Sequence, residues 1–63
     1  MSDENLIRQS YDEMIRTVFA QFYQASILAK TAEEKAKAEQ IFQTGILFAR
    51  QVRDRAVAIL PAA

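Results

Sequence analysis

Five residues in the middle of the chain, Lys30-Thr31-Ala32-Glu33-Glu34, constrain its fold more than any other segment. Thr31 suits a helix N-cap, where a side-chain oxygen accepts a hydrogen bond from a backbone N–H of the first turn. Glu34 follows three residues later and can reach back to the N–H of the cap, which completes a capping box. Because this pattern divides the 63 residues into nearly equal halves, it predicts two long helices joined by a turn at about 30–31.

The first half of the chain has no glycine or proline between Ser2 and Ala29, and Ser2 or Asp3 can cap its start. We therefore expect a helix over about 3–29. At about 100° per residue its apolar positions fall on one arc roughly 140° wide. These positions are Ile7, Tyr11, Met14, Ile15, Val18, Phe19, Phe22, Ala25 and Ala29.

The second half predicts a helix over about 32–60, ended by Pro61, which cannot continue a helix comfortably. Its apolar arc is again wide and contains Ala38, Ile41, Phe42, Gly45, Ile46, Phe48, Ala49, Val52, Ala56, Ile59 and Leu60. If the helices fold back antiparallel about Thr31, large side chains of the first helix face small ones of the second. This register brings Val18 and Phe19 level with Gly45, and Tyr11 level with Ala49.

Gly45 is the only glycine of the chain and falls in the middle of the second predicted helix. A glycine there costs roughly 1 kcal/mol relative to alanine. Because Gly45 lies on the apolar arc, we interpret it as a packing notch for a neighbouring helix or ring. A kink or hinge at Gly45 is the alternative.

The predicted fold class is all-α, a single helical-hairpin domain over residues 1–63 that pairs as a homodimeric four-helix bundle. A chain this short is marginal alone, and without cysteine or histidine it lacks the usual disulfide or metal supports. The expected core and dimer interface comprises Ile7, Tyr11, Met14, Ile15, Val18, Phe19, Phe22, Ala38, Ile41, Phe42, Gly45, Phe48, Ala49, Val52, Ala56 and Ile59. In length and layout the hairpin resembles the plasmid RNA-binding ROP family, although no residue pattern is shared.

Chemistry at a catalytic or metal site is not predicted. The chain has no histidine or cysteine, and its adjacent acids Asp12-Glu13 and Glu33-Glu34 diverge by about 100° on a helix. We expect no enzyme activity, no cofactor and no metal site. No apolar run approaches the ~20 residues that span a bilayer, and the acidic N-terminus is unlike a signal peptide. We therefore expect a cytoplasmic protein with no membrane partner.

Three functions remain open. The preferred one is a small, non-catalytic interaction or regulatory module that acts through a self-associating hairpin, with Leu47 as a possible outer interface. The second is an RNA- or DNA-binding bundle whose phosphate contacts come from Lys35, Lys37, Arg50 and Arg53, although eight basic residues are balanced by eight acidic ones. The third is a chaperone-like hairpin that binds a helix of another protein.

Overall fold

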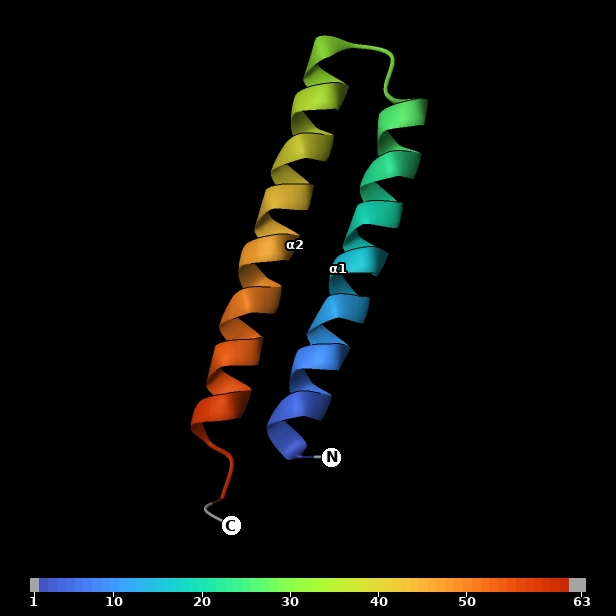
Figure 1. Cartoon of the computed structure of the whole chain (residues 1–63). Helices are drawn as coiled ribbons and strands as arrows, with labels where there is room; N and C mark the ends of the chain where they lie inside the picture. The colour runs from blue at the N-terminus through green and yellow to red at the C-terminus, as the bar shows by residue number, and fades with distance from the viewer. Residues whose placement is uncertain (1, 62–63) are drawn as a thin grey trace.

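The computed structural model describes residues 2–61 and contains two helices, α1 (Asp3–Leu28) and α2 (Ala32–Ala58). The helices run antiparallel and pack side by side along their whole length (Figure 1). The prediction of an all-helical hairpin is confirmed. Each helix ends one or two residues earlier than the sequence indicated, at Leu28 rather than residue 29 and at Ala58 rather than residue 60.

Helix α1 begins with a side-chain cap. The Ser2 hydroxyl accepts a hydrogen bond from the Asn5 backbone N–H at 3.1 Å, and Asp3 and Glu4 occupy the first turn, where negative charge suits the helix dipole. Glu4 also forms an ion pair with Arg8, one turn further on, at 2.9 Å. Asp12 and Arg16 have the same spacing but are not among the ion pairs of residues 2–61.

The turn between the helices is organised by one carboxylate. Glu34 Oε1 accepts hydrogen bonds from the backbone N–H groups of Lys30 and Thr31, at 3.0 and 3.1 Å. The Thr31 hydroxyl in turn accepts from the Glu34 backbone N–H at 3.1 Å, so the predicted capping box is present. Because Ala29 and Thr31 both have extended backbones, the chain reverses direction without a glycine.

The contact seam between the helices follows a spacing of three and four residues, as expected for two helices in side-by-side contact. On α1 the half-buried residues are Ile7, Tyr11, Ile15, Val18, Phe22 and Ala25. On α2 the buried or half-buried residues nearest α1 are Ala38, Phe42, Gly45, Ala49, Arg53 and Ala56. In the half of the seam nearer the turn, the rings of Phe22 and Phe42 pack with centroids 4.6 Å apart.

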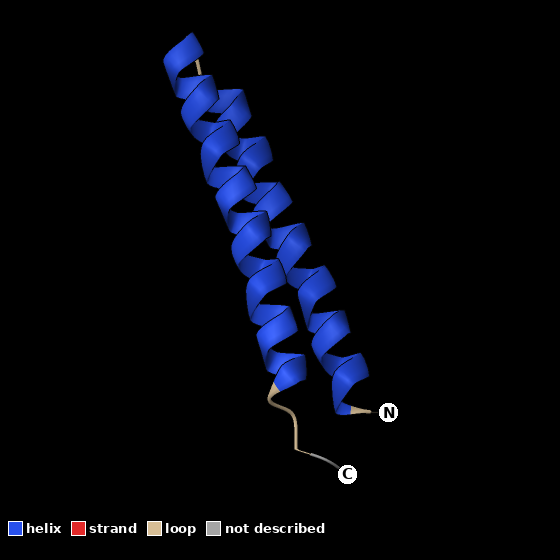
Figure 2. Ribbon diagram, turned by 90° about the vertical axis from the view of Figure 1, so that its left-hand side faces the viewer, coloured by secondary structure: helices blue, strands red, loops and turns tan. Residues whose placement is uncertain are grey.

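The hairpin is a layer only one helix thick. Its Cα atoms span 52 × 17 × 7 Å, and the view turned by 90° shows both helices in that single layer (Figure 2). Their radius of gyration is 15.0 Å, whereas a compact domain of this length has about 11 Å. Among residues 2–61, Ala38 alone is buried, with 7% of its surface exposed. The layer therefore has a seam but no enclosed core.

Candidate functional site

An apolar groove runs along one face of the hairpin, between α1 and α2. Two hollows, of about 460 and 130 Å³, are lined by both helices, and a third of about 460 Å³ lies beside them on α2 alone. All three include Gly45. The larger hollow toward the open end is lined by Leu6, Ile7, Ser10, Tyr11, Met14, Val18, Gly45, Phe48, Ala49, Val52, Arg53 and Ala56. The other two add Gln21, Phe22, Ala25, Ala38, Gln40, Ile41, Phe42 and Thr44.

Gly45 allows the helices to come close at the centre of this groove. A Cβ atom built on Gly45 would lie 3.2 Å from Cγ1 of Val18, tighter than an ordinary carbon–carbon contact. The predicted register of Val18 with Gly45 is therefore present, and the partner that occupies the notch is the other helix of the same chain. The described part of α2 is continuous through Gly45, which supports the packing interpretation over the kink.

Tyr11 differs from the predicted pairing. Its ring does not face Ala49 alone. The guanidinium carbon of Arg53 lies over the ring, 4.4 Å from the ring centroid. Ala49 and Tyr11 still line the same hollow. The arginine reaches the ring because its aliphatic stem can cross the seam while the charge stays near water.

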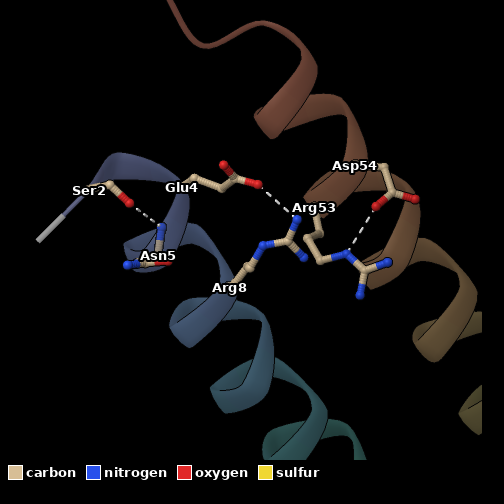
Figure 3. A network of polar contacts seen from close by, with 6 residues as sticks. All are labelled: Ser2, Glu4, Asn5, Arg8, Arg53 and Asp54. Atoms are coloured by element: carbon tan, nitrogen blue, oxygen red, sulfur yellow. Dashed lines mark hydrogen bonds and ion pairs between the residues drawn. The ribbon is translucent and has the colours of Figure 1, made fainter. Parts of the chain in front are cut away.

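Arg53 is the one charged residue in the groove lining. Its Nε donates a hydrogen bond to the Asp54 carboxylate at 3.0 Å (Figure 3). This hydrogen bond is the main cause that raises the pKa of the Arg53 guanidinium. Its side chain is 25% exposed. Sequence periodicity placed Arg53 outside the apolar arc, because the pattern counts a charged side chain as polar and ignores its stem.

The two faces of the layer differ in character. We call the side that bears the groove the groove face and the other side the back face. At about 100° per residue, the groove face takes Met14, Ile41, Phe48, Val52 and Ile59, whereas the back face takes Ile15, Phe19, Ile46 and Val57.

The predicted interface residues divide between the seam and these faces. The structure brings Ile7, Tyr11, Ile15, Val18, Phe22, Ala38, Phe42, Gly45, Ala49 and Ala56 into the seam. The remaining predicted residues, Met14, Phe19, Ile41, Phe48, Val52 and Ile59, are exposed in the hairpin. Leu6 was left off the predicted stripe, yet it lines the open-end hollow. Leu6 lies near the start of α1 and falls off the helical spacing of the apolar arc, so the periodic pattern does not predict it.

Leu47 stands on the outer edge of α2, with 56% of its surface exposed. At about 100° per residue it points away from α1, and Gln43 and Gln51 lie beside it. Leu47 does not line the groove. A single exposed leucine is common on protein surfaces.

The basic residues proposed from the sequence as phosphate ligands do not form one cluster. Lys35 and Lys37 lie near the turn, and Arg50 lies about 20 Å away along α2, at 1.5 Å per residue. Arg53 is held by Tyr11 and Asp54. These four side chains therefore present no compact basic patch within one hairpin.

Across residues 2–61, no three acidic, histidine or cysteine side chains come together as a group that could hold a metal ion. Within the same residues, neither helix carries an apolar stretch sufficient to cross a bilayer. The chain matches no protein-family model, and neither curated proteins nor solved structures give a match. The groove is therefore the feature of the described chain on which a functional proposal can be built.

Proposed function

We propose that this chain is a small, non-catalytic interaction module that works by self-association, with two hairpins pairing into a homodimeric four-helix bundle. The observation that carries the proposal is the exposed area. The chain has 5342 Å² of accessible surface, whereas a compact monomer of 7.2 kDa exposes about 4,100 Å². The excess of about 1,200 Å² exceeds the ~800 Å² that each partner contributes to a stable interface.

The chemistry of the exposed surface supports the same proposal. Large apolar side chains of the groove face with more than half of their surface exposed include Met14, Ile41, Phe48, Val52 and Ile59. Exposed apolar area of this extent on a soluble chain is typical of a surface that another molecule covers. In a four-helix bundle each helix gains a second neighbour, which is what the wide apolar arcs of both helices require.

Of the other two functions predicted from the sequence, nucleic-acid binding has less support, and the clamp is distinguished from the dimer by experiment. A nucleic-acid interface would need basic side chains that converge, and Lys35, Lys37 and Arg50 are spread along α2. A clamp for a foreign helix would use the same apolar surface as the dimer. The two proposals differ in the mass expected for the isolated chain in solution: self-association predicts a dimer, and the clamp predicts a monomer.

Static light scattering across a dilution series, with circular dichroism on the same samples, tests the proposal. We expect a helical species of twice the 7.2 kDa chain mass that loses helix as it dissociates on dilution. A chain that stays at 7.2 kDa at every concentration would contradict self-association and favour the clamp.

A further inference from the structure

The distribution of charge separates the two faces of the hairpin as docking surfaces. Within about 110° of the seam, the back face carries Arg8, Asp12, Lys35, Glu39 and Arg50. On the groove face, charge lies toward the two ends, at Asp3, Glu34, Lys37 and Arg55. Arg53, which also lines the groove, is paired with Asp54. Covering the back face would desolvate charges along its whole length, whereas covering the groove face would not.

The shape of the groove face fits a copy of itself. Phe48 projects from it with 65% of its surface exposed. Beside Phe48 lies the open-end hollow, whose floor includes the small residues Gly45, Ala49 and Ala56 and whose wall includes Met14. In a symmetric dimer the same patch must supply both the protruding group and the cavity that receives it, and this patch has both.

We infer that the groove face is the surface on which a second copy of this chain docks, and that Phe48 of each copy inserts into the open-end hollow of the other. This inference rests on the proposed function and specifies which face performs it. A hollow of about 460 Å³ is large enough to take a phenyl ring. The inserted rings would cover the apolar floor of both grooves without placing an acid or an unpaired base between the copies.

The lining also argues for a second copy over a foreign partner. Its polar members other than Arg53 are the neutral residues Ser10, Gln21, Gln40 and Thr44. Arg53 is already engaged by Tyr11 and Asp54. The groove therefore offers no free charge with which to select a partner of complementary charge. The hairpin is a flat layer, and its groove face bears no charge over its central length. Two identical hairpins can therefore stack through this face without burying charges.

The two phenylalanines on opposite faces provide a matched pair of variants. Phe48→Lys places a charge on the groove face, and Phe19→Lys places the same charge on the back face, where Phe19 is 56% exposed. We expect Phe48→Lys to raise the dimer dissociation constant, measured by sedimentation equilibrium, by about 30-fold or more, as for a central hot-spot residue. Phe19→Lys is expected to leave it within about threefold of wild type, as for an exposed residue outside the interface.

A second measurement does not depend on a charged variant folding. The chain has no cysteine, so Ser10→Cys and Ser26→Cys each introduce a single thiol by a nearly isosteric change. Ser10 lines the groove and Ser26 falls on the back face. As the protein concentration rises through the dissociation constant of the dimer, docking should bury the thiol of Ser10→Cys and slow its alkylation. The alkylation rate of Ser26→Cys should stay constant.

The outcomes separate this inference from the proposed function. Docking through the groove face is supported if Phe48→Lys loses the dimer and Phe19→Lys keeps it. It is also supported if dimer formation protects the thiol at position 10 and not the thiol at position 26. A dimer that persists in Phe48→Lys but is lost in Phe19→Lys, or protection at position 26 alone, overturns the choice of face and leaves self-association intact. A wild-type chain that remains monomeric overturns both.

Discussion

At the scale of single residues, the contact between Gly45 and Val18 limits how closely the two helices approach. A leucine at position 45 would be crowded, because its Cβ would lie 3.2 Å from Val18 Cγ1 and one of the two helices would have to shift. We expect Gly45→Leu to lower the free energy of unfolding by about 1–3 kcal/mol, the usual cost of overpacking, despite leucine's better helix propensity. Urea denaturation monitored by circular dichroism measures this loss.

The same contact makes a double-mutant cycle informative. Val18→Ala removes the methyl groups nearest the new side chain, so Gly45→Leu should cost less in that background, by at least about 0.5 kcal/mol. An equal cost in both backgrounds would show that position 45 is sensitive for a reason other than its contact with Val18.

Glu34 is the residue whose ionisation should matter most for the turn. Hydrogen bonds from the Lys30 and Thr31 backbone N–H groups lower the pKa of its carboxyl below the ordinary value of 4.5. Its stabilising effect is therefore complete above pH 4.5 and is lost as the pH falls through the lowered value in the folded state. We expect Glu34→Gln to reduce the thermal midpoint at neutral pH and to approach wild type in acid.

Glu33→Gln is the matched control for this prediction. It removes the same charge from the same first turn of α2, but Glu33 makes no hydrogen bond to the turn within residues 2–61. Thermal melts followed by circular dichroism across the acid range should show a smaller pH-dependent difference for Glu33→Gln than for Glu34→Gln. A similar profile for both variants would assign the effect to the helix dipole rather than to the capping box.

At the scale of the elements, two aromatic side chains of α1, Tyr11 and Phe22, lie in the seam, and the other two, Phe19 and Tyr23, are exposed. Tyr11 lies in the seam beneath Arg53, whereas Tyr23 is exposed. We expect Tyr11→Ala to destabilise the protein by about 1–2 kcal/mol, the value for losing a half-buried aromatic side chain. Tyr23→Ala should have less than about half of that effect in the same denaturation experiment. Equal effects would contradict the assignment of Tyr11 to the seam.

The two helices and their turn were predictable because local chemistry determines them. The capping box needs Thr31 and Glu34 alone, the start of α1 needs Ser2, and both apolar arcs can be counted along the sequence. The closeness of Gly45 to Val18 followed from the position of the turn, because antiparallel helices of known length have little freedom of register.

The parts that sequence alone could not give depend on three-dimensional detail. Periodicity places Met14 and Phe19 on the broad apolar arc of the first helix and Phe48 on that of the second. Without the position of the seam, it does not show that Phe19 lies on the opposite face from the other two. It also treats Arg53 as solvated, although a long aliphatic stem lets its guanidinium pack on Tyr11 within the seam. The groove depends on both details, since Phe48 borders it and Arg53 lines it.

At the scale of the whole molecule, the hairpin separates an uncharged surface from its charged ones. Its formal net charge is zero, and its ion pairs within residues 2–61 join neighbours on the same helix, Glu4 with Arg8 and Arg53 with Asp54. Exposed pairs of this kind contribute little to stability. What holds two copies together should therefore be burial of apolar surface, which salt does not screen.

Salt titration of the dimer tests this difference between the faces. If the groove faces stack, association brings few charges together beyond two copies of Arg53, each beside its own Asp54. The dissociation constant from sedimentation equilibrium should then change by less than about threefold between about 0.05 and 0.5 M NaCl, because apolar contacts are not screened. Stacking through the back face would pair Arg8, Asp12, Glu39 and Arg50 across the interface, and the dimer would weaken as those pairs were screened. A steep loss of affinity with salt would therefore contradict groove-face docking even if Phe48→Lys dissociates the dimer.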